Sequence, residues 1–270
     1  MAEPSDEGRS ATKVFEVANV YAEWDSDYYD PISAALYDRT VAAMLDALDA
    51  TSGKTVLDAG CGPGVHSVRA IRRGCRVHAI DISEVALDET RRRASAEGLA
   101  GSLTTAREDL TRLTLADASF EAVFSWGVLT HIPEIEKALA ELARVLRPGG
   151  RLAIQINNRT AWDHKLEAFA RALRGRPNRD LQHLPYGDGC WYDFHGEKLW
   201  VWQANLDAIA DFLARRGLVE RERRAVELTH VHQRIPGPLR SAVLRGNNLW
   251  QRLGLPPGPA VTNLAVFEKR

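Results

Sequence analysis

Short apolar runs alternate with longer amphipathic segments over residues 55–157. The apolar runs predict buried strands over 55–59, 76–80, 103–107, 120–125 and 151–156. The segments between them have a helical period, and the last one has Ile135, Leu139, Leu142 and Leu146 on one face. A strand and helix alternation of this kind predicts a mainly parallel sheet covered by helices on both faces.

A glycine-rich turn follows the first predicted strand. Gly60, Gly62 and Gly64 come directly after Asp58-Ala59. Glycines at this position let the backbone pass close to a ligand and adopt positive φ. The fingerprint of NAD-binding proteins requires a third glycine at position 65, which is Val65 here.

Two further acids stand at the ends of the next two strands. Asp81 lies about twenty residues after the turn, where a carboxylate can accept hydrogen bonds from both ribose hydroxyls. Asp109 follows the third strand, where it can accept a bond from an adenine amino group. Three acids at successive strand ends disfavour a pyrophosphate. They fit S-adenosylmethionine, which carries no phosphate and has a cationic sulfonium.

Five segments carry a family resemblance. VLDAGCGPG, HAIDIS, REDL, FEAVFSWGVLTHIPE and VLRPGGRLAIQ, in this order, resemble the class I S-adenosylmethionine-dependent methyltransferases of the small-molecule type. The resemblance covers 55–157 strongly and the chain after residue 205 weakly. It implies an α/β fold with a doubly wound, mainly parallel seven-stranded sheet whose last strand is antiparallel.

The resemblance also implies a set of cofactor contacts. Gly60 and Gly62 would lie near the methionine part of the cofactor, as would the backbone after the fourth strand. Asp81 would bind the ribose, and Ile82 would pack on the adenine. The full set of expected cofactor residues is Asp58, Gly60, Gly62, Asp81, Ile82, Asp109, Leu110, Ser125 and Trp126.

The chain is expected to form a single methyltransferase domain with additions to the core. We expect a disordered tail over 1–13, a helical cap over 14–50, the cofactor-binding core over 51–157 and a substrate lid over 158–204. A C-terminal helix and two strands follow over 205–270, with a Pro- and Gly-rich loop inserted at 235–259.

Composition and charge disfavour several kinds of binding partner. The formal net charge is −1, so no basic field attracts nucleic acid, and no apolar run is long enough to span a bilayer. The three cysteines are scattered and follow no disulfide or zinc spacing. We expect a cytoplasmic protein that acts on a small-molecule acceptor, without nucleic acid or stable membrane association. The oligomeric state is not indicated.

Several methyltransferase types are disfavoured by residues that the chain lacks. SWGVLTHIPE stands where nucleic-acid amino-methyltransferases carry an Asn/Asp-Pro-Pro-aromatic motif, and each cysteine follows a glycine instead of lying beside a proline. His230 and His232 would share one face of a strand and could bind a metal as a pair. No third ligand is evident, so a solvated strand face is the favoured interpretation, and no metal is expected.

The acceptor is expected under the lid. Residues 158–204 hold four of the seven tryptophans, and GCWYDFHGEKLWVW predicts a hairpin that turns near Gly196. The candidate acceptor residues are Tyr21, Trp191, Tyr192, His195 and Trp200. An alternative is that these aromatics only anchor the lid to the core. His131 is the candidate general base because it follows the fourth strand near the expected sulfonium. Its alternative role is to hold that loop together, and the other possibilities are His183 or His195 of the lid, or no base at all.

The favoured function is methylation of an oxygen or nitrogen of a small metabolite, in specialised biosynthesis. One alternative is a lipid or quinone methyltransferase, in which the Arg-rich run AFARALRGRPNR touches a membrane. The other is a non-catalytic subunit that binds the cofactor and regulates a partner.

Overall fold

The main sheet has seven strands in the order β3-β2-β1-β4-β5-β10-β9. The computed structural model describes residues 14–15, 31–175, 180–194, 196–235 and 237–270. The strands of this sheet are β1 (Thr55–Ala59), β2 (Arg76–Asp81), β3 (Leu103–Arg107), β4 (Phe120–Trp126), β5 (Leu146–Asn157), β9 (Leu218–Glu227) and β10 (Thr262–Lys269). β1 pairs in parallel with β2 and β4, whereas β10 is antiparallel to both β5 and β9. The predicted fold class is confirmed.

The strand order reverses between β1 and β4. β1 is followed by β2 and β3 on one side, and β4 begins the other half of the sheet. In open α/β sheets of this type, ligands bind at the carboxyl ends of the strands at this reversal. The glycine turn follows β1, and residue Gly127 follows β4, so both lie at this crevice.

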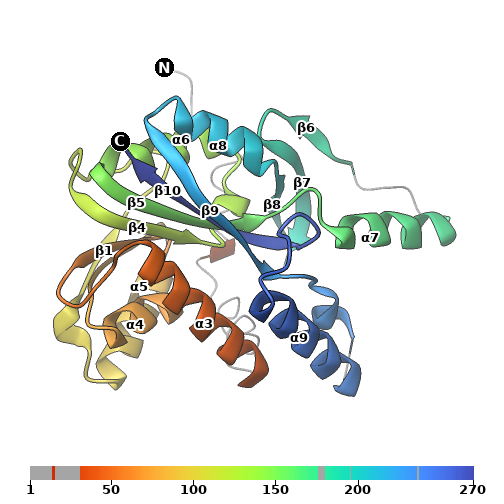
Figure 1. Ribbon diagram of the computed structural model, residues 1–270, viewed down its shortest axis with the longest axis horizontal. Helices are drawn as coiled ribbons and strands as arrows, with labels where there is room; N and C mark the ends of the chain where they lie inside the picture. Colours follow the sequence, from red (N-terminus) through yellow and green to blue (C-terminus); the bar gives the residue numbers. More distant parts are fainter. Residues whose placement is uncertain (1–13, 16–30, 176–179, 195, 236) are drawn as a thin grey trace.

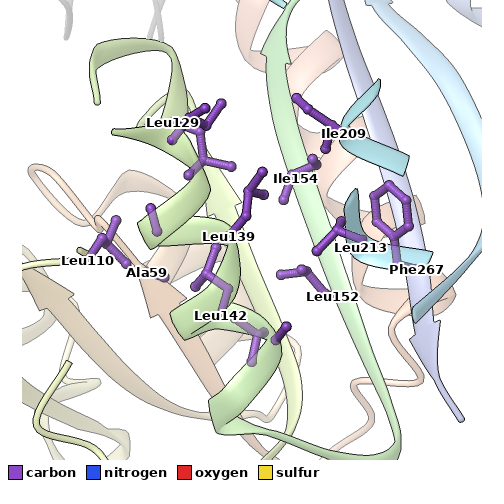
Figure 2. Packing of buried hydrophobic residues seen from close by; sticks show 14 of the residues in the cluster. Ala59, Leu110, Leu129, Leu139, Leu142, Leu152, Ile154, Ile209, Leu213 and Phe267 are labelled. Atoms are coloured by element: carbon purple, nitrogen blue, oxygen red, sulfur yellow. The ribbon is translucent and has the colours of Figure 1, made fainter. Parts of the chain in front are cut away.

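Helices cover both faces of the sheet (Figure 1). One face carries α6 (Ile135–Val145) and α8 (Leu206–Ala214), and the other carries α3 (Pro31–Ala47), α4 (Val65–Arg72) and α5 (Glu84–Ala96). Figure 2 shows the first layer, in which Leu139 and Leu142 of α6 meet Leu152 and Ile154 of β5. α6 is strongly amphipathic, so burial of its apolar stripe fixes it on the sheet.

Phe267 of β10 offers a test of this layer, because its side chain is fully buried against β5 and α8. Phe267→Ala removes most of a buried aromatic side chain and is expected to cost about 3–5 kcal/mol of unfolding free energy. Urea denaturation followed by circular dichroism measures the loss. Leu253→Ala, at an exposed position, serves as control and is expected to stay within about 0.5 kcal/mol of the wild type.

The segment after β5 forms a helix and a second sheet. α7 (Trp162–Leu173) comes first, followed by β6 (Gln182–Leu184), β7 (Gly187–Phe194) and β8 (Glu197–Ala204), which form a three-stranded antiparallel sheet. β7 and β8 are the predicted hairpin, since Phe194 pairs with Glu197. The sequence analysis placed a lid here but did not predict α7.

Two other expectations were wrong. The stretch 235–259 is mainly a helix, α9 (Gly237–Arg252), where a loop was expected. Asn247 of α9 is buried and exchanges two hydrogen bonds with the backbone of Thr229, which stabilises a helix that Gly237 and Gly246 disfavour by propensity. β5 begins at Leu146, five residues before the strand expected over 151–156, so Pro148-Gly149-Gly150 is part of an irregular strand.

Candidate active site

The three glycines of the turn have different structural roles. Gly60 has φ +84°, and a Cβ there would lie 2.4 Å from a methyl carbon of Val128. Gly64 has φ +76°, and a Cβ there would meet the side chain of Thr90. A Cβ on Gly62 would meet nothing within 4 Å. Packing within the chain therefore explains Gly60 and Gly64, whereas the backbone at Gly62 borders open space.

Asp81 closes the turn from the end of β2. Its Oδ2 accepts a hydrogen bond from the Gly62 backbone N–H at 2.8 Å, and its Oδ1 accepts one from the Ser83 N–H at 3.0 Å. Burial raises the pKa of Asp81, and these backbone hydrogen bonds oppose the rise because they favour the carboxylate. The expected ribose acid thus lies directly against the expected methionine-binding glycine.

Asp58 lies deeper, below the turn. Its carboxyl is fully buried and accepts a 2.6 Å hydrogen bond from the Ser67 hydroxyl at the start of α4. Burial raises the pKa of Asp58 to about 7, with the charge of Asp81 adding to the rise and the Ser67 bond opposing it. Asp58 therefore fixes the turn on α4 from beneath.

The raised pKa of Asp58 makes stability depend on pH. Between about pH 4 and 7 the folded protein keeps a proton on Asp58 that the unfolded chain has released, so the free energy of unfolding falls as pH rises through this window. Asp58→Asn stays neutral at every pH and can still accept from Ser67. We expect this variant to abolish the fall in unfolding free energy across this pH window, which is on the order of a few kcal/mol in the wild type. Urea titrations of the wild type and the variant at several pH values measure the slope.

The expected adenine residues follow β2 and β3. Ile82 is half-buried, and Leu110 is buried in the first core layer. Oδ1 of Asp109 accepts hydrogen bonds from the backbone N–H and the hydroxyl of Thr111, at 2.9 and 2.7 Å. This bonding caps the turn that follows β3, and the other carboxylate oxygen lies 3.5 Å from Nε of Arg112 in an ion pair.

The end of β4 contributes backbone and an aromatic cluster. The Ser125 hydroxyl donates to the Ala59 carbonyl at 2.8 Å, which ties β4 to β1. Trp126 is buried and lies 4.6 Å from the ring of His66 and 6.1 Å from the ring of Tyr37, centroid to centroid. Sequence analysis missed His66 and Tyr37, because nothing local in α3 or α4 indicates which of their residues face β4.

His131 lies in a short 3₁₀ helix (Leu129–His131) that follows β4. Its Nδ1 is 2.9 Å from the Trp200 carbonyl oxygen. Since a carbonyl only accepts, Nδ1 carries the proton and Nε2 keeps the lone pair. Burial lowers the pKa of His131 to about 4, although the bond to Trp200 opposes this. The imidazole is therefore neutral at pH 7 and a weak base.

The lid hairpin is fastened to the loop that holds His131. Besides the bond from His131, Trp202 Nε1 donates to the Ile132 carbonyl at 2.7 Å, and the Thr130 hydroxyl donates to the Trp202 carbonyl at 3.3 Å. Trp200 and Trp202 are buried with Trp191 packed edge-on against Trp200. These tryptophans anchor β8 to the core, as in the alternative interpretation of the lid.

Of the residues expected to contact the acceptor, Tyr192 lines a cavity. The cavity has a volume of about 310 Å³ and lies between α7, the hairpin and the ends of β5, β9 and β10. Its polar lining is Asn157, Asp163, His164, Glu167, Tyr192, Gln203 and His230, and its apolar lining is Leu166, Ala170, Val201, Val231 and Val261. Trp191 and Trp200 do not line it, and Tyr21 and His195 lie outside the described residues.

A buried carboxylate supports one wall of this cavity. Glu227, at the end of β9, has Oε2 3.1 Å from Nε2 of His230. Burial alone would raise the pKa of Glu227, but the charge and hydrogen bond of His230, the charge of His232 and a hydrogen bond from Tyr37 together lower it. Glu227 is therefore ionised, and it links Tyr37 beside Trp126 to His230 in the cavity.

The neighbouring histidine was misplaced by the sequence analysis. β9 ends at Glu227, so His230 and His232 lie beyond the strand, with ring centroids 6.1 Å apart and planes at 90°. Among the described residues, no group of three or more His, Cys, Asp or Glu side chains is arranged to bind a metal ion.

The sheet reversal, the glycine turn and the acid at the end of β2 define an α/β protein with a candidate nucleoside-binding crevice at the carboxyl ends of β1 and β4. A family model described as a methyltransferase domain matches residues 56–150. A ubiquinone biosynthesis O-methyltransferase of Hahella chejuensis is 33% identical over 168 residues, which cover 61% of this chain and 67% of that protein. The chain belongs to the class I S-adenosylmethionine-dependent methyltransferases.

Two further proteins show how far the similarity extends. Methyltransferase GfsG of Streptomyces halstedii is 35% identical over 136 residues, half of this chain and 49% of GfsG, so the chain matches about half the length of that relative. The solved structure of geranyl diphosphate C-methyltransferase from Streptomyces coelicolor A3(2) superposes with a TM-score of 0.59 and 17% identity. It covers 91% of this chain and 88% of that chain, and at this identity it supports the fold alone.

Within the described part of the chain, no helix combines the length and apolar character needed to cross a membrane.

Proposed function

We propose that the protein transfers the methyl group of S-adenosylmethionine to an oxygen or nitrogen of a small-molecule acceptor in specialised metabolism. The observation that carries this proposal is the contact between Asp81 and the Gly62 N–H at the strand reversal. It joins the two residues expected at the ribose and methionine parts of the cofactor.

The cofactor would be held by this chain's strand ends. Its bound sulfonium supplies a methyl carbon already activated for displacement. Gly62 leaves room beside the backbone, Asp81 presents a carboxylate to the ribose hydroxyls, and Ile82 and Leu110 provide apolar surface for the adenine. Ser125 and Trp126 position the backbone near the methionine part through their bonds and contacts with β1 and His66.

The acceptor would occupy the cavity lined by Tyr192 and His230. Asn157 lines it and donates from Nδ2 to the Thr130 hydroxyl at 3.1 Å, which connects the cavity to the loop after β4. The lining includes the carboxylates of Asp163 and Glu167 and no lysine or arginine. It therefore favours a neutral or cationic acceptor and disfavours phosphates and carboxylates.

Two histidines are candidates for removing the acceptor's proton. His131 has a pKa of about 4, and its Nδ1 is committed to the Trp200 carbonyl. His230 lines the cavity and is oriented by the ionised carboxylate of Glu227, the arrangement that activates an imidazole as a base. We favour His230 as the base and retain His131 as a residue that holds the lid to the loop.

Cofactor binding tests the proposal directly. S-adenosylhomocysteine should raise the melting temperature of the full chain, and the shift should grow with its concentration. NAD should give no shift, because the turn has Val65 where a pyrophosphate site needs glycine. Stabilisation by NAD but not by S-adenosylhomocysteine would exclude the proposed cofactor.

Radiolabel transfer to an acceptor in a cell extract separates an enzyme from a cofactor-binding regulatory subunit.

The lid supplies a second test, because its aromatic residues differ in position. Tyr192→Ala should weaken acceptor binding by roughly 1–3 kcal/mol, which raises the acceptor KM about 5- to 150-fold, and should leave cofactor affinity within a few-fold. Trp200→Ala should instead lower the melting temperature, because its ring is buried between Trp191 and Trp202. Normal turnover by the Tyr192 variant would place the acceptor elsewhere.

A lipid or quinone acceptor is the second candidate. The ubiquinone biosynthesis O-methyltransferase noted above is one of the relatives, and α7 exposes four large apolar side chains beside the cavity. An acceptor of this kind would reach the cavity from a membrane surface. Radiolabel recovered in an organic extract of membranes would favour it over a water-soluble metabolite.

A further inference from the structure

The exposed apolar side chains of this protein are concentrated on two helices. Of the nine large hydrophobic side chains that are exposed among the described residues, six belong to α7 and α9, and a seventh, Leu253, directly follows α9. They are Trp162, Leu166, Phe169, Leu173, Leu239, Leu249 and Leu253. Single exposed leucines are common on protein surfaces, but a concentration of this kind marks an interaction site.

The four on α7 form one stripe. They follow the spacing i, i+4, i+7, i+11, so their side chains lie within an arc of about 60° around the helix. Their exposed fractions are 52 to 73%, and none of the twelve residues of α7 is buried. Figure 1 shows α7 extending sideways beyond the sheet, with α9 below it in this view.

The two helices meet at a pair of tryptophans. The rings of Trp162 and Trp250 lie 6.2 Å apart, centroid to centroid, at 67°. Leu249 precedes Trp250 on α9, Leu253 directly follows the helix, and both side chains are exposed. We call the exposed side of α7 and α9, with the seven residues named above, the α7–α9 face.

The charge of these helices differs from that of the whole chain. α9 contains Arg240, Arg245 and Arg252 and no acidic residue. α7 with its C-cap contributes Lys165, Arg171 and Arg174 against Asp163 and Glu167. The α7–α9 segments therefore carry a formal charge of +4, while the chain as a whole carries −1. The two helices thus combine a positive formal charge with exposed apolar side chains in a chain that is slightly negative as a whole, and this combination complements an anionic lipid surface.

We propose that the α7–α9 face binds peripherally to an anionic lipid bilayer, with the apolar stripe of α7 lying in the headgroup region. This inference revises the expectation of no stable membrane association. It uses no residue of the cofactor site, so it can fail while the proposed methyl transfer stands. If that proposed function also holds, membrane binding would place the cavity beside the bilayer, because Leu166, Glu167 and Ala170 of α7 form one of its walls.

Vesicle co-sedimentation of the full chain tests the proposal. The probes are vesicles of phosphatidylcholine alone and vesicles that also contain phosphatidylglycerol. We expect the protein to pellet with the anionic vesicles, to bind the neutral ones about tenfold less tightly, and to be released by salt. Phe169→Ser with Leu173→Ser should weaken binding to the anionic vesicles at least about tenfold. Arg245→Glu should weaken it several-fold.

Two controls match these variants. Leu184→Ser removes an exposed leucine on β6, and Arg92→Glu reverses a charge on α5, so neither should alter vesicle binding. Both test residues of α7 are highly exposed and do not line the cavity, so the variants should keep the melting temperature and the response to S-adenosylhomocysteine. That response reports the proposed cofactor site separately.

Two results would overturn the proposal. One is that the wild type does not pellet with anionic vesicles, or that the Phe169 and Leu173 variant pellets equally well. The other is that the wild type forms dimers in sedimentation equilibrium without binding vesicles, and that the same variant is monomeric. The α7–α9 face would then be an interface between two copies of the chain.

Discussion

Asp81→Ala is expected to reduce the affinity for S-adenosylhomocysteine at least about tenfold, and more if both ribose hydroxyls bind the carboxylate. A hydrogen bond to a charged group contributes about 1.5–3 kcal/mol, and each 1.4 kcal/mol is a factor of ten in affinity. Asp81 also accepts the N–H groups of Gly62 and Ser83, so its loss disturbs the turn as well as the ribose contact. Isothermal calorimetry measures the affinity directly.

Two companion variants separate these contributions. Asp81→Asn keeps an acceptor for only one of the Gly62 and Ser83 N–H groups and removes the charge, so it should disturb the turn less than Asp81→Ala and still lose most of the affinity. Asp88→Ala removes an exposed acid from α5 and should leave binding unchanged. Unaltered affinity in both Asp81 variants would contradict its assignment to the ribose.

The core of the fold could be predicted because its signals are local. β1, β2 and β4 are short segments whose residues are mostly buried, and Asp58, Gly60 and Asp81 stand at strand ends where the alternation itself places them. The structure brings Asp81 and Gly62 into contact, as expected from the parallel pairing of β1 and β2. These relations follow from neighbouring elements in the chain.

Relations across long stretches of chain could not be predicted. α9 depends on Asn247, whose partner is the backbone of Thr229, and on contacts of Asn248 and Gln251 with Arg39 and Thr40 of α3. Its glycines and proline indicated a loop, and tertiary contacts overrode that propensity. Glu227 was missed for a similar reason. It is one of several acids in β9, and only the fold brings it to Tyr37 and His230.

The sequence pattern does not distinguish the lid aromatics that are buried from those that line the cavity. Trp191, Tyr192 and Trp200 are close in sequence, yet Trp200 is buried in the core and Tyr192 lines the cavity. Strand alternation separates neighbouring residues onto two faces, but the sequence does not say which face meets the core when both carry aromatics. Burial in the structure makes that distinction.

His230→Gln is expected to lower kcat for the acceptor about a hundredfold or more, within the range of lost general base catalysis. The measurement uses the acceptor found by radiolabel transfer, with cofactor affinity checked by calorimetry. His183→Gln is the matched control, because His183 is exposed on β6 and paired with Asp188. His131→Gln should mainly lower the melting temperature, since it disturbs the bond that ties the loop after β4 to Trp200.

Glu227→Gln distinguishes a base from a residue that only shapes the cavity. A base must be deprotonated to act, so the rate should rise with pH up to a plateau. The ionised Glu227 stabilises the protonated form of His230, and its removal should therefore move the acid limb of the profile to lower pH and lower the plateau. If His230 and Glu227 only shape the cavity, Glu227→Gln should change KM or the melting temperature, and the acid limb of the pH profile should stay at the same pH. If His131→Gln abolishes turnover and both His230→Gln and Glu227→Gln spare it, the base is His131, and the cavity contributes binding alone.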